Sequence, residues 1–545
     1  MLQAILSAVL ATSADPLFRE IGQRALPGVV THCGSPAKDF IVEANGGGVI
    51  LGDFDGDDRV DLVIVDGSTL ERVEKGEPGF PPRLFLGQGD GTFLPAGPTW
   101  EMTGGRWGMG GAAGDIDGDG WLDLVVTQWG PKRVFLNDRG RGFREITAEA
   151  GLVGDEWSSS AAFLDYDRDG HLDLVVVNYL KFDPKAVARR GEAGCKWKGI
   201  DVMCGPEGLV PTHDRLFRGR GDGTFEERTS PAGFRPAAAA FGLGVMTLDY
   251  DDDGDTDVYV TNDSTPNHLW ENRGDGTFAE VGFRRGVSHD ANGKEQAGMG
   301  IACGDWNGDG RDDLHVTNFS AESNALYVSS KNLGFRERSA AAGLSGPSLP
   351  KLGWGTHFAD FDLDGDLDLS VLNGHVYPEA DQPGTDTRYA QESQLYRSAG
   401  DGRFTVEPLS DALPAVSRAS ACADLDGDGD LDIVGLRIEG AVQVFLNSVA
   451  AGKHGHWLRV KLRSRKGNRD GIGARVIAEW EGGVRRAEIR TAGGYQSAIP
   501  AEAHFGLGAT ERLERLVVRW PSGREQVLEG VSVDRVLVVD EADEK

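Results

Sequence analysis

The stretch Asp115-Ile-Asp117-Gly-Asp119-Gly-Trp-Leu-Asp123-Leu-Val-Val126 has aspartates at positions one, three, five and nine, and an apolar run directly after them. The same spacing occurs seven times, and successive first positions are 50 to 84 residues apart. Small and apolar residues precede each copy, as in Gly298–Gly304, and β-prone residues follow it, as in Leu174–Val177. The pattern therefore predicts a loop that joins two strands of a hairpin, repeated seven times. We number these acidic loops 1 to 7 in chain order.

Each acidic loop offers a set of oxygen donors and no recurring His or Cys, which favours Ca²⁺ over transition metals. Position twelve is apolar, for example Ile64, and the flanks are strands, so the loops are not EF-hands. A single loop could be a solvated turn, but seven with one spacing indicate up to seven structural Ca²⁺ sites. The predicted ligands are Asp53, Asp55, Asp57 and Asp61; Asp115, Asp117, Asp119 and Asp123; Asp165, Asp167, Asp169 and Asp173; Asp249, Asp251, Asp253 and Asp257; Asp305, Asn307, Asp309 and Asp313; Asp360, Asp362, Asp364 and Asp368; and Asp424, Asp426, Asp428 and Asp432.

The sixth position of the loops is glycine, as in Gly120, except in loop 1. Glycine there permits a tight turn. Asp58 takes this place in loop 1, so we expect that site to be strained or weaker.

Two further apolar segments follow the loop in a complete repeat, which therefore contains four predicted strands. In the first repeat they are Leu84-Phe-Leu86 and the strand that begins after the turn Gly89-Asp-Gly-Thr-Phe93. Seven such units predict an all-β, seven-bladed β-propeller over residues 15–449. The seventh repeat lacks its last strand, and Phe18-Arg-Glu-Ile21 matches Phe143-Arg-Glu-Ile146. We expect the N-terminal segment to supply that strand and close the ring, which a linear solenoid would not require.

The acidity of the chain is confined to the repeats. The first 450 residues hold 72 acidic and 39 basic residues, whereas residues 451–545 hold 14 and 17. The net charge of −30 argues against nucleic acid as a partner. Alternating runs such as Trp457–Leu462 and Arg515–Trp520 predict a small C-terminal β-sandwich over residues 452–545.

Residues 1–14 form a short apolar run that ends in small residues, which is typical of a secretory signal peptide. A frayed terminus, or a start codon placed too late, is the alternative. With the calcium loops, this run predicts a secreted, extracellular or periplasmic protein. No other apolar run approaches the length of a membrane span, so no transmembrane segment is expected.

The acidic loops resemble the FG-GAP/VCBS calcium repeats of integrin α-chain propellers. The segments Gly471–Arg475, Gly493–Ser497, His504–Gly508 and Val518–Gly523 resemble, in this order, the ASPIC/UnbV domain. Together they make the chain similar to the cartilage acidic protein family. That resemblance implies an insert at about 180–214 with a disulfide between Cys195 and Cys204, the latter in a Cys-Gly-Pro sequence.

The other cysteines carry no recognisable redox motif. Cys303 and Cys422 fall in strands just before acidic loops, where they are expected to be free core residues. Cys33 is left unassigned.

Three functions are compatible with the sequence. The first is a monomeric binding or adhesion module for an extracellular protein or glycan, using loops that directly follow blade strands: 178–180, 262–268, 318–320 and 373–377. The second is an enzyme, a lyase or hydrolase acting on extracellular polysaccharide, with a base among His268, His315, His357 and His375. The third is a scaffold for a larger assembly. No catalytic motif supports the second, and the residues His504, Arg475, Tyr495 and Ser497 are interpreted as turn and packing residues.

Overall fold

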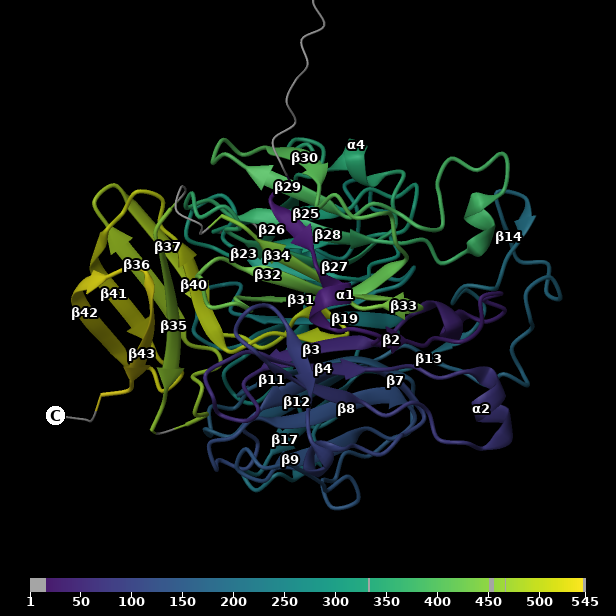
Figure 1. Cartoon of the computed structure of the whole chain (residues 1–545), viewed down its shortest axis with the longest axis horizontal. Helices are drawn as coiled ribbons and strands as arrows, with labels where there is room; N and C mark the ends of the chain where they lie inside the picture. Colours follow the sequence, from purple (N-terminus) through teal and green to yellow (C-terminus); the bar gives the residue numbers. More distant parts are fainter. Residues whose placement is uncertain (1–15, 332–333, 450–454, 466, 543–545) are drawn as a thin grey trace, which may run out of the picture.

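The computed structural model describes residues 16–331, 334–449, 455–465 and 467–542. The predicted signal peptide, residues 1–14, lies outside them. Strands dominate the fold (Figure 1). Its helices are short: α1 (Gly22–Ala25), α2 (Leu70–Lys75), α3 (Gly282–Arg285), α4 (Ser345–Ser348), and the 3₁₀ turns η1 (Ile41–Ala44), η2 (Pro98–Trp100) and η3 (Pro378–Asp381). Among the described residues, no helix is both long and apolar enough to cross a membrane.

Seven sheets carry the seven acidic loops, and each is built on four antiparallel strands, in chain order apart from the last sheet. Two of these sheets gain a fifth strand from the C-terminal segment. Each sheet begins with the strand that precedes its loop. The first four sheets are β3 (Gly48–Gly52), β4 (Asp61–Val65), β5 (Arg83–Gly87) and β6 (Phe93–Pro95); β7 (Trp107–Gly114), β8 (Asp123–Trp129), β9 (Arg133–Asn137) and β10 (Phe143–Glu145); β11 (Ser158–Leu164), β12 (Asp173–Asn178), β17 (Arg215–Gly219) and β18 (Phe225–Glu227); and β19 (Gly242–Leu248), β20 (Asp257–Asn262), β21 (His268–Asn272) and β22 (Phe278–Glu280).

The remaining three sheets follow the same plan. They are β23 (Ile301–Gly304), β24 (Asp313–Val316), β25 (Ala325–Ser330) and β26 (Gly334–Glu337); β27 (Gly353–Ala359), β28 (Asp368–Asn373), β29 (Gln394–Ser398) and β30 (Phe404–Pro408); and β31 (Ser417–Ala423), β32 (Asp432–Arg437), β34 (Gln443–Asn447) and β1 (Phe18–Glu20).

The seven sheets form a closed, propeller-like ring. The first strand of each sheet contacts the first strand of the next, and β31 contacts β3. The N-terminal strand β1 completes the last sheet, because Phe18 lies opposite Asn447 in an antiparallel pair. The prediction that the N-terminal segment at residues 18–21 supplies the missing strand and closes the ring is thus confirmed.

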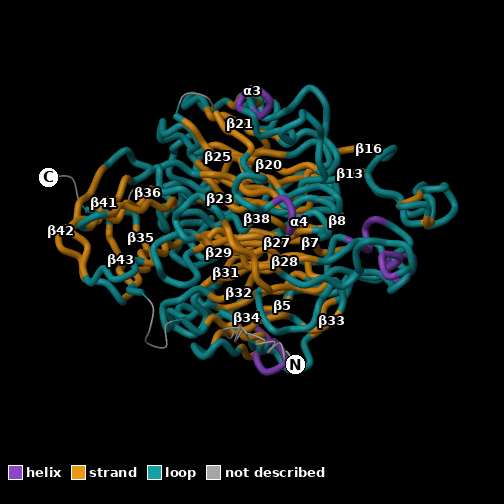
Figure 2. Tube along the Cα trace, turned by 90° about the horizontal axis from the view of Figure 1, so that it is seen from above, coloured by secondary structure: helices purple, strands orange, loops and turns teal. Residues whose placement is uncertain are grey.

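The C-terminal segment folds into two sheets that share an apolar core. A three-stranded sheet contains β40 (Glu502–Gly506), β35 (Trp457–Arg463) and β43 (Arg535–Asp540). A four-stranded sheet contains β37 (Gly483–Glu488), β36 (Arg475–Trp480), β41 (Arg512–Arg519) and β42 (Glu525–Ser532). Leu458 and Val460 of the first sheet belong to one buried cluster with Val476 and Val518 of the second. These sheets lie at one side of the ring, and the insert strand β14 (Lys196–Trp197) lies at the other (Figures 1 and 2).

A short segment between the two C-terminal sheets enters the ring. Strand β38 (Gly494–Tyr495) pairs with β19, and β39 (Ser497–Ala498) pairs in parallel with β3. Together they contact the first strands of all seven sheets. Tyr495 is fully buried, and its hydroxyl donates to the Asn45 carbonyl oxygen at 2.8 Å. Residues 494–498, which we call the axial segment, therefore fill the centre of the ring.

Glycines in the first strands make room for the axial segment. A Cβ atom at Gly48 would lie 2.3 Å from the Gln496 carbonyl oxygen, and one at Gly110 would lie 2.7 Å from the Gln496 Cα. Both distances are too short for a side chain. The small-residue strands that precede the acidic loops are thus needed for close packing at the axis.

The insert follows β12, the second strand of the third sheet, and contains two small two-stranded ribbons. β13 (Leu180–Lys181) pairs with β16 (Val210–Pro211), and β14 pairs with β15 (Ile200–Asp201). A disulfide joins Cys195 to Cys204, whose Cα atoms are 5.3 Å apart. A further ribbon joins β2 (Val30–Thr31) to β33 (Gly440–Ala441).

Candidate metal loops and an axial cavity

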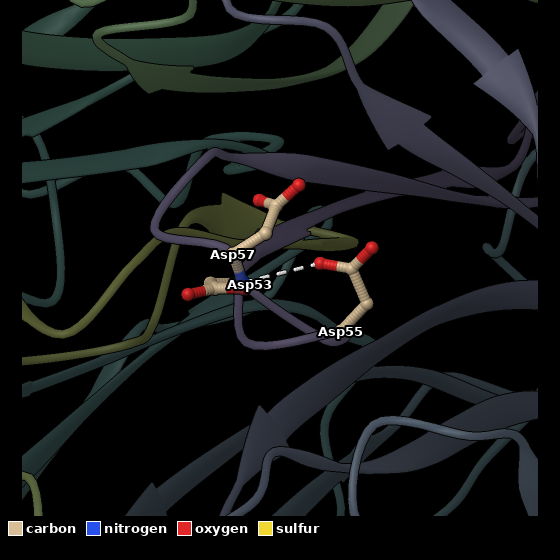
Figure 3. Close-up of side chains that lie close together, drawn as sticks. All are labelled: Asp53, Asp55 and Asp57. Atoms are coloured by element: carbon tan, nitrogen blue, oxygen red, sulfur yellow. Dashed lines mark hydrogen bonds between the residues drawn. The ribbon is translucent and has the colours of Figure 1, made fainter.

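The seven acidic loops share one backbone hydrogen-bond pattern. In all seven, the N–H of position six donates to Oδ2 of the first aspartate, at 2.7–3.2 Å. In all seven, the N–H of position seven donates to Oδ1 of the fifth-position aspartate, at 2.8–3.2 Å. Figure 3 shows loop 1, where the N–H of Asp57 also donates to Asp55. The loop backbone thus folds around its own carboxylates.

The turn requires left-handed backbone at positions four and six. The sixth residue has a φ between 85° and 101° in the six loops with glycine there, and Asp58 has a φ of 67°. Arg168, Asp252 and Leu363 adopt left-handed φ values at position four. A left-handed conformation costs a residue with a side chain roughly 1–2 kcal/mol. Loop 1 therefore carries the strain expected from its Asp58.

In each loop, the ninth-position aspartate forms a hydrogen bond with the third strand of its sheet. Its Oδ1 accepts a backbone N–H from that strand in all seven repeats, at 2.7–2.9 Å. Asp123, for example, is fully buried and accepts from Asn137 through Oδ1 and from Ile116 through Oδ2. Burial raises the pKa of Asp61 to about 7 and that of Asp123 to about 8. The sequence pattern predicted this residue as a metal ligand but did not indicate its hydrogen bonds to the sheet.

The carboxylates of a loop converge closely enough to hold one ion. Among the described residues, six groups of at least three acidic or other metal-binding side chains offer ligand atoms within 4.8 Å of one another, and five of these groups each comprise three aspartates of one acidic loop. These five groups are Asp53, Asp55 and Asp57; Asp115, Asp117 and Asp123; Asp165, Asp167 and Asp173; Asp249, Asp251 and Asp257; and Asp360, Asp362 and Asp364.

Several of the loop oxygens are buried without a hydrogen-bond partner. Among the described residues, these include Oδ1 of Asp115, Asp165 and Asp305 at the first position. Buried carboxylate oxygens are costly unless a cation or donor satisfies them. An all-oxygen donor set with unsatisfied carboxylates fits a hard cation such as Ca²⁺.

The C-terminal sheets pack against the acidic loops through arginines. Arg475 lies 2.9 Å from Asp249 in loop 4, and Arg459 lies 2.6 Å from Asp424 in loop 7. Arg490 pairs with Asp312 of loop 5 at 2.6 Å. The two oppositely charged parts of the chain are thus in direct contact, and Arg475 does more than shape a turn.

A cavity of about 590 Å³, which we call the axial cavity, is lined by residues of the ring and by residues of the insert such as Met203 and Gly208. Residues that follow strands of four different sheets line it: Tyr179, Asp263, Phe319 and Tyr377. The four loops that were predicted from the sequence to contact a ligand therefore each contribute a residue to this one cavity. Asn45, Leu243, Met299 and Trp354 also line the cavity, but no local sequence pattern distinguishes them.

Asp263 lines the cavity and accepts hydrogen bonds from two hydroxyl groups. Its Oδ2 accepts from the Tyr179 hydroxyl at 2.6 Å, and its Oδ1 accepts from the Ser264 hydroxyl at 2.9 Å. Burial raises the pKa of Asp263, although the two hydroxyl donors oppose this shift. Burial likewise raises the pKa of Tyr377 to about 12.

The candidate histidine bases are buried in the sheets and their ends. Burial lowers the pKa of His315 and His375 to about 3 and that of His268 and His357 to about 4. None of the four lines the axial cavity. His504 is half-buried; its Nε2 lies 2.9 Å from the Gly429 carbonyl oxygen, which indicates a structural role.

The three remaining cysteines are free. Cys33 is buried, and burial raises the pKa of its thiol to about 11. Cys303 and Cys422 are half-buried, and burial also raises their thiol pKa values. Thiols with raised pKa values are poor nucleophiles at neutral pH.

The ring and its loops define an all-β protein with FG-GAP repeats. The model of the FG-GAP-like repeat matches residues 53–126, 115–176, 249–316 and 305–371, and that of the ASPIC and UnbV family matches residues 464–545. Over about half of its length the chain is homologous to cartilage acidic protein 1. It is 32% identical to the Homo sapiens protein over 282 residues and 30% identical to the Xenopus tropicalis protein over 277.

These alignments cover 49% of this chain and 39% and 40% of the two relatives, respectively. The chain therefore matches less than half of the length of these curated relatives. Among solved structures, an Agrocybe aegerita lectin described as recognising non-reducing terminal N-acetylglucosamine aligns at 15% identity, with a TM-score of 0.40. That alignment covers 73% of this chain and 86% of the lectin.

Proposed function

We propose that the chain is an exported, monomeric binding or adhesion protein for an extracellular protein or glycan. It would be built on a seven-bladed calcium propeller over residues 15–449, with a β-sandwich over residues 452–545 and a signal peptide over residues 1–14. The FG-GAP repeats, the homology to cartilage acidic protein 1 and the disulfide support this proposal.

The aspartates at positions one, three, five and nine of the acidic loops, with Asn307, would hold up to seven Ca²⁺ ions. Bound Ca²⁺ supplies positive charge that offsets the repulsion between neighbouring carboxylates. The loop backbone orients these side chains through its own N–H groups. The role of the metal is therefore structural.

The observation that carries the binding function is the axial cavity. Four sheets contribute Tyr179, Asp263, Phe319 and Tyr377 to one concave site. Ligand sites are usually concave, mostly apolar and equipped with a few polar groups, and this cavity has that composition. A polysaccharide lyase or hydrolase has less support, because the four histidines proposed as a base are buried and do not line the cavity.

A glycan and protein array, screened with and without calcium and followed by product analysis, tests the proposal. We expect ligand retention that depends on calcium, without a reaction product. Accumulation of a cleaved product would favour the enzyme instead. Elemental analysis of the purified protein should find several Ca²⁺ per chain, and a value of zero or one would contradict the calcium assignment.

A further inference from the structure

The axial cavity contains a carboxylate that lacks a cationic partner. Asp263 is held by the hydroxyl groups of Tyr179 and Ser264, which are neutral donors. Within the described residues, no lysine, arginine or histidine forms an ion pair with Asp263, and the charged neighbour that acts on its pKa is Glu322. The two hydroxyl groups thus hold the carboxylate of Asp263 in place but leave its negative charge without a counter-ion.

The walls around Asp263 are largely apolar. Leu243, Met299, Phe319 and Trp354 line the cavity. Asp263 is half-buried, so its carboxylate loses part of its hydration when ionised. A neutral hydroxyl group can donate to it but does not offset its charge. A cation would, and aromatic rings such as Phe319 and Tyr377 are favourable neighbours for one.

The other charged groups of the cavity do not compensate Asp263. Glu207 and Glu322 add negative charge to its lining. Lys196 also lines the cavity, but its ammonium group pairs with Asp201 at 2.7 Å. The charge balance of the site therefore favours a positively charged ligand.

We propose that the axial cavity binds a primary ammonium group carried on an apolar chain, with Asp263 as its counter-ion. Such a group is found in the lysine side chain of a protein and in a free alkylamine. The inference rests on the proposed binding function and specifies its ligand class. A neutral sugar is the weaker candidate, because it would leave the carboxylate without a counter-ion.

Titration of the calcium-loaded full chain with hexylamine, hexanol and hexanoate tests the inference. These probes share one apolar chain and differ in charge. We expect hexylamine to bind at least tenfold more tightly than the other two. Equal binding of hexylamine and hexanol would overturn the proposal, and this comparison needs no variant.

The Asp263→Asn variant tests the counter-ion directly. We expect it to lose the preference for hexylamine over hexanol and to bind hexylamine at least tenfold more weakly. Asp411→Asn is the matched control, because Asp411 is exposed and does not line the cavity. Unchanged hexylamine binding by Asp263→Asn would overturn the assignment.

Competition with peptides distinguishes a protein lysine from a free amine as the source of the ammonium group. A lysine-containing pentapeptide that displaces hexylamine, where its norleucine analogue does not, would support a protein ligand. Displacement by neither peptide, with hexylamine still bound, would support a free amine. If the Asp263→Asn variant still binds a ligand found on the array, the proposed binding function stands and the ammonium site is wrong.

Discussion

Arg459 Nη1 lies 2.6 Å from Asp424 Oδ2, and both side chains are buried. The same guanidinium donates to both carboxylate oxygens of Glu502 at 3.0 Å. Arg459 belongs to the C-terminal sheets, whereas Asp424 is the first residue of acidic loop 7. This contact therefore couples a proposed metal site to the neighbouring sheets.

Replacing Arg459 with methionine should destabilise the protein strongly. In calcium-free protein, the substitution leaves the buried carboxylates of Asp424 and Glu502 without a cation, and we expect a loss of about 3 kcal/mol in urea denaturation. Arg515→Met is the control, because the pairs of Arg515 with Glu479 and Glu529 are partly exposed. It should cost less than about 1 kcal/mol. Equal losses would show that the buried pair contributes no more than a surface pair.

Removing calcium should lower the melting temperature, by an amount that depends on pH. A native-state ligand stabilises the fold, so chelation should destabilise it. In the metal-free fold, burial raises the pKa of Asp165 to about 7 and that of Asp313 and Asp360 to about 8, well above the ordinary 3.8. The folded state then binds more protons than the unfolded state, so its stability falls as the pH rises from about 4 to 8.

Calcium should reverse this trend, because metal binding requires ionised carboxylates and strengthens as the pH rises. Calorimetric scans of chelated and calcium-loaded protein between pH 5 and pH 8 provide the measurement. The same melting temperature with and without chelator throughout this range would argue against calcium as a structural ion.

Replacing Asp58 with glycine should stabilise loop 1. The residue has a left-handed φ of 67° and is exposed, so glycine would relieve backbone strain. We expect a gain of about 1 kcal/mol in denaturant unfolding and tighter calcium binding at this loop. The converse control is Gly310→Ala in loop 5, where a Cβ would meet no atom within 4 Å. This variant should lose stability through its φ of 85° alone, and a neutral result would mean that the turn tolerates side chains freely.

The ninth and fifth positions of loop 2 should respond differently to the same substitution. Asp123→Asn places an amide against the N–H groups of Ile116 and Asn137, so it should cost about 2 kcal/mol even without calcium. Asp119→Asn, at a more exposed position, should mainly weaken calcium binding. Chelated and loaded unfolding curves of both variants separate the two roles. Equal effects in chelator would contradict a separate structural role for Asp123.

The repeat pattern contained most of the information on the ring. Each acidic loop lies between two paired strands because its residues specify a local turn, and local turns are readable from sequence. The strand match of Phe18 was also readable, since it copies a segment that recurs in other repeats.

Long-range contacts could not be predicted from the sequence in this way. Tyr495 contacts Asn45 from 450 positions away, and the interpretation as a turn and packing residue missed this contact across the ring. Similarly, nothing near Arg459 indicates which carboxylate it meets. The charge difference between the two parts of the chain was visible, but complementary charge does not determine which surfaces touch. Asn45 carries no motif either, and only the fold brings it to the cavity.

The axial segment has a consequence for the order in which the molecule can assemble. The last sheet is incomplete until β1 meets β34, so ring closure needs residues from both ends of the propeller. The centre stays hollow until Tyr495 and its neighbours have also been synthesised and inserted. Because chains emerge from the ribosome N-terminus first, the segment that contacts all seven sheets appears only after all the strands of the ring have been synthesised. We therefore expect the nascent ring to leave its central strands uncovered until residues 494–498 insert between them.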